Sequence, residues 1–390
     1  MVALVRKAVA GLLVAGLAVY LLTGSGTDGM RLLGHLGKRI FYETSQERLA
    51  VQQSDMVMDT VAQLTATGPE AQAAVDESFA RLHELEALLS PGAAGSDSQR
   101  LAQSAGSGEW VPVSPEMYHL LSLSQRISAL SGGAWDVTMG PLTALWGIGT
   151  EHGRVPSEGE IAAAKGLVNW RWLELDEDSQ SARLLQPGMS LDVGGIAKGL
   201  AVDEVRRIYA AHDIQSGLIN LGSSSLYAVG ASEGSRPWRI GIRHPRSEDT
   251  QQPLAVLRLS GEALSTSGDY EHFFEQEGVR YHHILDVRTG RPAGLELPPE
   301  QRAMSVTAVV AGANPDAGLL ADVLTTTAFV LGPREGRDFL QGLAGEKGFE
   351  GIEGEVTGQD GLLWVTPGLR ERLRRLADGF RLDELSQVEP

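Results

Sequence analysis

The spacing of apolar residues along the chain predicts several amphipathic helices. Between residues 71 and 89, Val75, Phe79 and Leu82 belong to a series of apolar residues at helical spacing, which is typical of a helix with one buried face. A second helix is expected from Ser114-Pro115-Glu116 to about residue 130, because serine is a favoured N-cap and proline suits the first helical position. Further helices are expected over 199–212, over about 315–331, and after Thr366-Pro367, the last with a basic face of Arg370, Arg372, Arg374 and Arg375.

Alternation of apolar and polar residues predicts strands between these helices. The segment from Trp238 to Arg243 alternates as a half-exposed strand does. Further strands are expected at 58–66, 254–259, 305–310 and 361–365. Strands and helices are mixed without strict βαβ alternation, which favours an α+β fold over a doubly wound sheet. We therefore expect a single catalytic domain over residues 56–370, followed by a C-terminal helix and tail over 371–390.

The N-terminal segment has the pattern of an export signal. Arg6 and Lys7 precede an uncharged apolar run from Ala8 to Leu22. Basic residues before such a run indicate a signal-anchor or signal peptide with a cytoplasmic start. No clean small-x-small cleavage site follows, so we expect an uncleaved anchor over residues 1–25 rather than a cleaved signal or a buried helix of the domain. Residues 26–55 are expected to be a tether, which places the domain on the periplasmic or extracytoplasmic side of a bacterial inner membrane.

Composition narrows the possible functions. A chain of 390 residues with 42% apolar residues has enough material for a substantial core. The formal charge of −17 argues against non-specific nucleic-acid binding, because no basic excess is present to neutralise phosphates. The chain contains no cysteine, which excludes disulfides, thiolate chemistry and cysteine-based metal sites.

Two oxygen-bearing side chains form a candidate metal site. Asp322 and Thr326 are four residues apart in an expected helix, so they lie on the same face. A carboxylate and a hydroxyl are hard ligands, which suit Mg²⁺ better than zinc or copper. Zinc at the His282-His283 pair is disfavoured, because adjacent residues of a strand point to opposite faces and no third histidine stands at ligand spacing.

A glycine-rich run, Leu191-Asp192-Val193-Gly194-Gly195-Ile196-Ala197-Lys198-Gly199, is a candidate phosphate site. We expect a strand over 191–193, a turn at the two glycines and a helix start near 196–199. Glycines admit a ligand close to the backbone, helix N–H groups bind anions, and Lys198 adds a positive charge. The run matches neither a Walker A motif nor a GxGxxG fingerprint, and an ordinary strand–turn–helix remains an open interpretation. The glycine-rich run and the candidate Mg²⁺ site together suggest an enzyme that acts on a nucleotide diphosphate.

The segment Ser131–Leu142 has two interpretations from its residues alone. Either Trp135 packs on a planar ligand ring while Asp136 accepts a hydrogen bond, or Trp135 anchors the loop in the core. Tyr270, in the segment 264–270, likewise has two interpretations, a site residue or a core residue with a satisfied hydroxyl.

Five blocks in order resemble one known family over roughly residues 56–345. They are S-G-G-A-W-D-V-T-M-G-P-L (131–142) with the following Trp146-Gly147, L-D-V-G-G-I-A-K-G (191–199), T-S-G-D-Y (266–270), H-H-I-L-D-V-R-T-G (282–290) and A-D-V-L-T-T (321–326). This set closely resembles the FAD:protein FMN transferases, the ApbE-like flavin transferases. The resemblance implies their fold, and an enzyme that splits the diphosphate of FAD with Mg²⁺, releases AMP, and transfers FMN to a threonine or serine of an acceptor protein, here expected to be membrane-associated.

The resemblance also implies roles for individual residues. Asp322 and Thr326 match the side-chain metal ligands, with the carbonyl of Gly195 as a third. His283 matches the histidine associated with transfer, and either it or a carboxylate such as Asp322 would take the acceptor proton. The matched flavin-nucleotide contacts are Met58, Ala134, Trp135, Asp136, Asp192, Lys198 and Ile284.

Two departures from the family pattern leave alternatives open. The family usually has Gly-Gly-Asp after an Asn-Leu pair, whereas this chain reads Asn220-Leu221-Gly222-Ser223-Ser224-Ser225. Met58-Asp59-Thr60 stands where glycine is usual in the middle. An FAD pyrophosphatase, with water as the acceptor, and a catalytically silent flavin-binding protein are the alternatives. The presence of Asp322, Thr326 and Lys198 favours the transferase.

Overall fold

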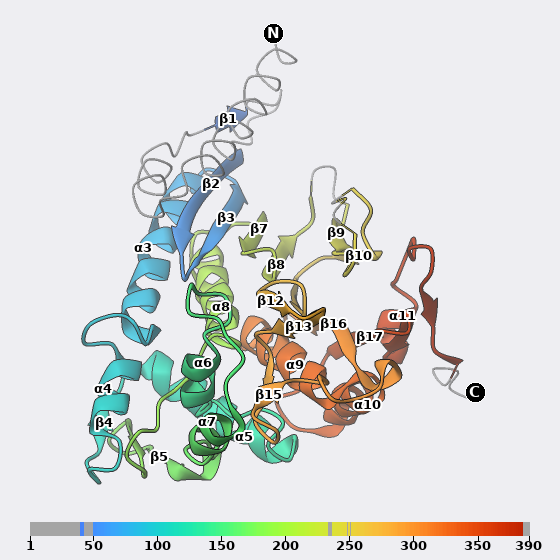
Figure 1. Cartoon of the computed structure of the whole chain (residues 1–390). Coiled ribbons are helices and arrows are strands. Elements are labelled where there is room, and N and C mark those ends of the chain that lie inside the picture. The colour runs from blue at the N-terminus through green and yellow to red at the C-terminus, as the bar shows by residue number, and fades with distance from the viewer. Residues whose placement is uncertain (1–39, 43–49, 233–235, 248, 250, 385–390) are drawn as a thin grey trace.

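The computed structural model describes residues 40–42, 50–232, 236–247, 249 and 251–384, and a mixed sheet dominates them (Figure 1). Within these residues, ten strands pair in the order β1-β2-β3-β7-β8-β11-β16-β17-β18-β19. The pairs are antiparallel except β18–β19, which is parallel. The strands are β1 (Ile40–Tyr42), β2 (Ala50–Val57), β3 (Thr60–Thr67), β7 (Ser216–Leu221), β8 (Ser225–Gly230), β11 (Glu262–Gly268), β16 (Ala303–Ala311), β17 (Ile352–Gly358), β18 (Leu362–Val365) and β19 (Arg381–Leu382).

Smaller sheets and the helices surround this sheet. The remaining strands form the pairs β9 (Trp238–Ile242) with β10 (Ala255–Leu259), β12 (Phe273–Gln276) with β13 (Val279–His282) and β14 (Leu285–Asp286) with β15 (Arg291–Pro292), and a three-stranded sheet of β4 (Val111–Pro112), β6 (Ser181–Leu184) and β5 (Leu173–Asp176). The α-helices are α3 (Ala71–Leu89), α4 (Asp97–Ser104), α5 (Pro115–Leu130), α6 (Gly140–Trp146), α7 (Glu158–Lys165), α8 (Ala197–Ala211), α9 (Ala317–Leu331), α10 (Pro333–Gly342) and α11 (Pro367–Arg370).

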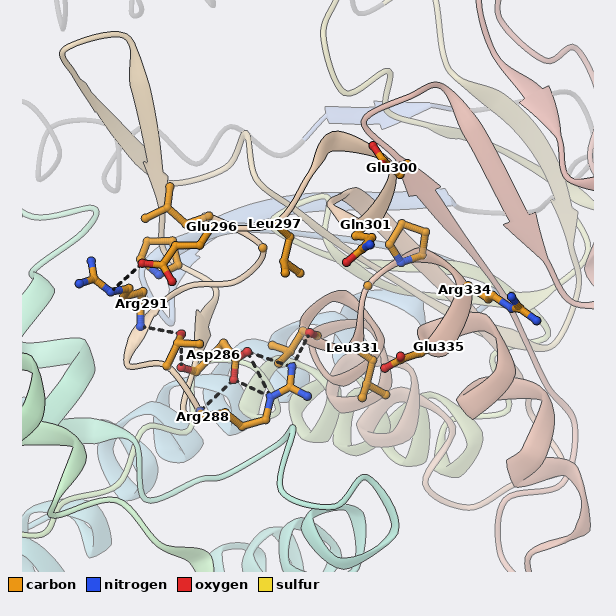
Figure 2. Close-up of a pocket in the computed structure, with 17 residues that line it drawn as sticks. Asp286, Arg288, Arg291, Glu296, Leu297, Glu300, Gln301, Leu331, Arg334 and Glu335 are labelled. Atoms are coloured by element: carbon orange, nitrogen blue, oxygen red, sulfur yellow. Dashed lines mark hydrogen bonds and ion pairs between the residues drawn. The ribbon is translucent and has the colours of Figure 1, made fainter.

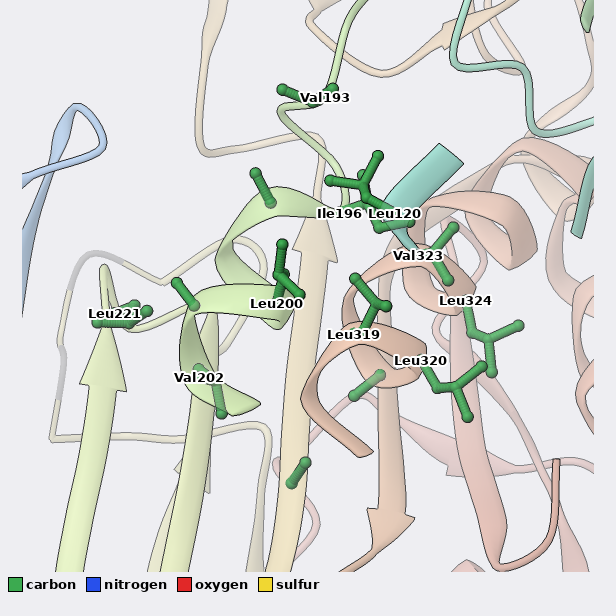
Figure 3. Close-up of a cluster of buried hydrophobic side chains, with 14 of the residues drawn as sticks. Leu120, Val193, Ile196, Leu200, Val202, Leu221, Leu319, Leu320, Val323 and Leu324 are labelled. Atoms are coloured by element: carbon green, nitrogen blue, oxygen red, sulfur yellow. The ribbon is translucent and has the colours of Figure 1, made fainter. Parts of the chain in front are cut away.

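The main core lies between the sheet and helices α3, α8 and α9. Figure 3 shows side chains of α8 and α9, among them Leu200 and Leu319, in this buried cluster. The two helices approach closely at Gly199 and Gly318, since a Cβ built at Gly199 would lie 2.3 Å from the carbonyl oxygen of Gly318. This close approach sets α9, which carries Asp322, directly against the start of α8.

A second apolar cluster covers the opposite face of the sheet. Strands β9 and β10 and the segment after α11 contribute to it, with Leu257 and Leu369 fully buried. The helix predicted after residue 366 is wrong in its length, because α11 ends at Arg370. Beyond it the chain pairs with β10, where the backbone N–H of Arg374 donates to the carbonyl of Val256 (3.1 Å), so residues 371–384 belong to the packed domain.

The predicted α+β class and several element positions are confirmed. Helices α3 and α5 match the predicted ranges, and the hydroxyl of Ser114 accepts a hydrogen bond from the N–H of Met117 (3.1 Å) as the expected N-cap. The tether prediction is wrong for residues 50–55, which lie in β2 and pair along its length with β3. The strand start predicted at Met58 is a turn instead, and residues 191–193 form no strand, although Ser190 bridges to Met139.

The described part of the chain contains no helix that is both long enough and apolar enough to cross a membrane. The predicted anchor over residues 1–25 lies outside the described residues.

Candidate functional site

A pocket of about 530 Å³ opens where several segments distant in sequence converge. The β2–β3 turn, the β7–β8 turn, the end of β11, the start of α8, one face of α9 and the segment 283–285 all contribute to its lining. The predicted site residues that line it are Met58, Trp135, Asp192, Gly195, Lys198, His283, Ile284, Asp322 and Thr326. The fold therefore brings together residues from five different parts of the sequence.

Asp322 is held in place by three hydrogen-bond donors. Its side chain is buried, with 4% exposed, and its Oδ2 accepts from the backbone N–H of Gly199 (2.9 Å). Its Oδ1 accepts from the hydroxyls of Ser225 (2.9 Å) and Ser265 (3.0 Å). Sequence reasoning missed both serines as partners of Asp322, although each lies in or beside a quoted segment. The donors fix the direction of the carboxylate and leave lone pairs for a cation.

The three predicted metal ligands lie together. Thr326 stands one turn beyond Asp322 on α9, and a Cβ built at Gly195 would lie 3.1 Å from the Thr326 hydroxyl oxygen. Glycine lets the backbone at position 195 come this close without displacing a neighbouring side chain. A carboxylate, a hydroxyl and a carbonyl are hard oxygen donors, which fit Mg²⁺. Among the residues that the structure describes, no group of three or more His, Asp or Glu side chains forms another candidate metal site.

The glycine-rich turn before α8 lines the pocket with Gly194, Gly195 and Lys198. Helix α8 starts at Ala197; its N-cap residue, Ile196, makes no side-chain cap, and the first-turn N–H of Gly199 is bonded to Asp322. Asp192 accepts from the N–H of Gly194 (2.8 Å) and from the hydroxyl of Thr143 (2.6 Å), so it shapes the turn. The ammonium of Lys198 donates to the carbonyl of Gly194 (3.1 Å). The positive end of a helix dipole with a neighbouring lysine is suited to bind a phosphate.

Trp135 anchors its loop in the core and also lines the pocket. Its indole is buried, and its Nε1 donates to the hydroxyl of Ser124 (2.6 Å), which anchors the ring in the core. The edge of the same ring lies against Gly195, 3.1 Å from where a Cβ would stand, and it lines the pocket. The tryptophan therefore forms a rigid wall of the pocket rather than a mobile stacking partner.

Asp136 and Ala134 do not line the pocket. The carboxylate of Asp136 accepts from the backbone N–H and the hydroxyl of Thr138 (2.8 and 2.6 Å) and from the N–H of Trp170 (2.8 Å). Burial raises the pKa of Asp136, against the opposing effect of these hydrogen bonds. Asp136 therefore stabilises its own loop. Ligand contacts were predicted at Asp136 and Ala134, but neither residue is among those that line the pocket.

The two adjacent histidines face different surroundings, as the strand alternation predicts. His282 is buried, its Nε2 lies 3.1 Å from the carbonyl of Ala293, and its ring packs edge-on against Phe329. His283 lines the pocket, and its backbone N–H and Nδ1 lie 3.0 and 3.3 Å from the carbonyl oxygen of His272. Because a carbonyl only accepts, Nδ1 carries the proton and Nε2 has the free lone pair.

The surroundings of His283 keep its ring neutral. Desolvation, together with the nearby His272 and His282, lowers the pKa of His283 to about 3. The ring is therefore a hydrogen-bond acceptor at neutral pH, but it holds an extra proton only weakly.

Comparison with known proteins identifies the family. The model of the ApbE family matches residues 58–348. The chain belongs to the ApbE family. A FAD:protein FMN transferase from Treponema pallidum is 31% identical over 327 residues, which cover 80% of this chain and 85% of that protein. One from Klebsiella pneumoniae is 35% identical over 258 residues, which cover 66% of this chain and 75% of that protein.

Solved structures of ApbE proteins share the fold. The ApbE protein of Thermotoga maritima superposes with a TM-score of 0.72 at 26% identity, covering 84% of this chain and all of that one. The flavinyl transferase ApbE of Pseudomonas stutzeri gives a TM-score of 0.69 at 29% identity, covering 85% of this chain and 98% of that one. These likenesses span the described domain and confirm the predicted ApbE-like fold.

The two departures from the ApbE pattern lie at the same pocket. Met58 and Asp59 form the two-residue turn between β2 and β3 with φ of +53° and +58°, and Ser223 has φ of +60° in the β7–β8 turn. Such left-handed conformations cost a non-glycine residue free energy. Met58, Asp59 and Ser224 line the pocket, and the N–H of Met58 is held by the carboxylate of Glu86 (2.8 Å). Strained backbone therefore gathers at this edge of the pocket, as it often does at functional sites.

A second cavity of about 520 Å³ lies between the loop 286–302 and the α9–α10 junction (Figure 2). Its charged residues are largely paired, with Arg288 donating to Asp286 (2.9 Å) and to the carbonyl of Val330 (3.1 Å). Arg291 lies 3.3 Å from Glu296. No residue predicted for the flavin site lines this cavity.

Proposed function

We propose that this ApbE-family chain is a FAD:protein FMN transferase, which moves FMN from FAD to a threonine or serine of an acceptor protein and releases AMP. The observation that carries the proposal is one pocket that combines the oxygen donors of Asp322 and Thr326 with the start of α8 and Lys198. The names of the relatives support it. The glycine-rich turn and the oxygen donors line the same pocket, as binding of a diphosphate together with a cation requires.

The charges that line the pocket support a requirement for a cation. Its acidic residues are Asp59, Glu86, Asp192, Glu271 and Asp322, whereas Lys198 is the single lysine or arginine in its described lining. The diphosphate of FAD adds further negative charge, which would be repelled at short range. We infer that Mg²⁺ binds at Gly195, Asp322 and Thr326.

The chain's own residues would position the reacting groups. Lys198 and the positive end of α8 attract the diphosphate, and the three donors on Asp322 keep its carboxylate in one orientation. The free Nε2 of His283 accepts a hydrogen bond from the attacking hydroxyl and orients it. When bound, Mg²⁺ supplies neutralisation of the charge that develops on the departing AMP.

One experiment separates the transferase from its alternatives. The chain is incubated with FAD, Mg²⁺ and a candidate acceptor protein, and the acceptor is weighed by mass spectrometry. An acceptor heavier by one FMN supports the transferase, free FMN with AMP indicates a pyrophosphatase, and unchanged FAD indicates a flavin-binding protein. The parallel reaction without Mg²⁺ tests the inferred cation.

We also propose that the N-terminal segment anchors the domain outside the cytoplasm, where a membrane-associated acceptor would meet it. The proposal rests on Arg6 and Lys7 ahead of the apolar run from Ala8. A C-terminal fusion to a reporter that is active only after export should be active in cells. Activity confined to a cytoplasmic reporter would contradict this topology.

A further inference from the structure

Helices α8 and α9 hold each other by their first turns. The backbone N–H of Gly199, in the first turn of α8, donates to the carboxylate of Asp322 on α9 (2.9 Å). In return, the N–H groups of Gly318 and Leu319, in the first turn of α9, donate to the carboxylate of Asp203 on α8 (3.0 and 2.9 Å). First-turn N–H groups have no partner within their own helix, so each helix supplies an acceptor that the other one lacks.

Two facing glycines allow this exchange of hydrogen bonds. A Cβ built at Gly199 would lie 2.3 Å from the carbonyl oxygen of Gly318, and a Cβ built at Gly318 would lie 2.5 Å from the carbonyl oxygen of Gly199. The two helix backbones therefore lie against each other with no side chain between them at this point. A shift of α9 along α8 would break the hydrogen bonds in both directions.

Asp203 is a carboxyl group that the proposed chemistry does not use. Its side chain is completely buried, with 0% exposed, and it does not line the pocket that contains Asp322. Burial raises the pKa of Asp203 to about 6, against the opposing effects of the two N–H donors and of Arg206. Burial of a carboxyl costs free energy, so its place at the start of α9 indicates a role beyond filling space.

Arg206 extends the hold of α8 to the connection that precedes α9. Its guanidinium lies 3.6 Å from the carboxylate of Asp203 and donates to the carbonyls of Asn314 (3.1 Å) and Pro315 (2.6 Å). The start of α9 is thus held by a carboxylate on its N–H groups, while a guanidinium holds the carbonyls before it.

The inferred cation site draws its oxygen donors from both sides of this contact. Asp322 and Thr326 belong to α9, whereas Gly195 lies in the turn that leads into α8. Asp322 follows Leu319 by three residues, or roughly 4.5 Å along the helix axis. Mg²⁺ requires near-ideal geometry with oxygens at about 2.0–2.1 Å, so the placement of α9 against α8 decides whether the three donors can share one cation.

We propose that Asp203 is a positioning residue for the cation site, because it fixes α9 against α8 so that Asp322 and Thr326 stand opposite the carbonyl of Gly195. The inference rests on the proposed transferase function and on the Mg²⁺ site inferred within it. Asp203 touches neither FAD nor the cation, and it acts through the first turn of α9.

The test is cation binding by the full chain with FAD, followed by electron paramagnetic resonance of Mn²⁺ in place of Mg²⁺. Asp203→Ala removes the acceptor of two N–H groups and should weaken Mn²⁺ binding by about tenfold or more, as the loss of a supporting group around a metal site does. Asp203→Asn keeps one acceptor oxygen but loses the charge, so it should weaken Mn²⁺ binding by about threefold. The asparagine variant provides the same comparison should the alanine variant not fold.

Asp97→Ala is the matched control. Asp97 is also a buried carboxyl, and it accepts from the N–H and the hydroxyl of Ser114 at the start of α5 (2.8 and 2.6 Å). This substitution should destabilise the domain, because buried donors lose their acceptor, but it should leave Mn²⁺ affinity unchanged. The comparison separates a specific effect on α9 from a general loss of stability.

Hydrogen exchange at the start of α8 gives a readout that depends on neither the cation nor activity. In Asp203→Ala the hold on α9 is lost, so the N–H of Gly199 should lose its bond to Asp322 and exchange about tenfold faster in mass spectrometry of peptides that contain Gly199. Asp97→Ala should not change this exchange.

The outcomes distinguish this inference from the function on which it rests. Folded Asp203 variants with the parental Mn²⁺ affinity, or with parental exchange at Gly199, overturn the positioning role while the transferase proposal stands. A parental chain that neither binds Mn²⁺ in the presence of FAD nor transfers FMN overturns the transferase proposal, and the role of Asp203 at a cation site with it.

Discussion

Glu355 is a buried carboxyl group of β17, and its ionisation should make the free energy of unfolding depend on pH. The substitution Glu355→Gln should remove this dependence. The folded state raises the pKa of this carboxyl from 4.5 to about 7 because burial penalises the charged form. Glu355→Gln replaces it with a neutral side chain of nearly the same shape. The difference in free energy of unfolding between the two chains then isolates the ionisation of one group.

The sign and size follow from the two pKa values. The folded state holds the proton more tightly than the unfolded state, so the contribution of Glu355 is fully present below about pH 4.5. It falls as pH rises towards 7 and is lost above that pH. At about 1.4 kcal/mol for each pH unit, folding of the parental chain loses about 3 kcal/mol relative to Glu355→Gln between about pH 4 and pH 9.

Urea unfolding at a series of pH values measures this difference directly. The substitution should change the midpoint but not the slope of the urea dependence, because the surface exposed on unfolding stays the same. The same change at Glu177, in the exposed turn after β5, controls for the chemistry of the substitution. A difference that stays constant from acid to alkaline pH would refute the argument, since it would mean that Glu355 binds protons equally in the folded and unfolded states.

Four further substitutions test the site. Asp322→Ala should abolish FMN transfer and lower the free energy of unfolding by about 2 kcal/mol, because three buried donors lose their acceptor; mass spectrometry of the acceptor and thermal unfolding measure the two effects. Lys198→Ala should weaken FAD binding by about tenfold in fluorescence titration, because the variant loses the positive charge beside the diphosphate; an unchanged affinity would mean that the lysine does not touch the diphosphate. His283→Ala should bind FAD almost normally yet transfer FMN about 100-fold more slowly in single turnover, and loss of binding with an unchanged transfer rate would make it a binding residue instead. Gly199→Ala should destabilise the domain by about 2 kcal/mol in urea unfolding, because its Cβ would collide with the carbonyl of Gly318.

Local patterns in the sequence were sufficient for the elements whose structure depends on near neighbours. The apolar spacing over residues 71–89 and the Ser114 cap predicted α3 and α5, because helix geometry and capping act within a few residues. The spacing of Asp322 and Thr326 likewise placed both on one face of α9. The ordered sequence blocks led to the family, which the comparisons then confirmed.

Contacts between distant segments decided the rest. Residues 50–55 are a strand because β3 pairs with them, and the chain after α11 leaves the helix to pair with β10. Asp136 belongs to its own loop because its acceptors are taken by Thr138 and Trp170. The proton affinity of Glu355 depends on three strands whose residues are far apart in sequence, since only their pairing removes water from the carboxyl and aligns it with Thr307. A one-dimensional pattern can show that a glutamate lies in a strand, but burial in the folded sheet sets how tightly it holds a proton.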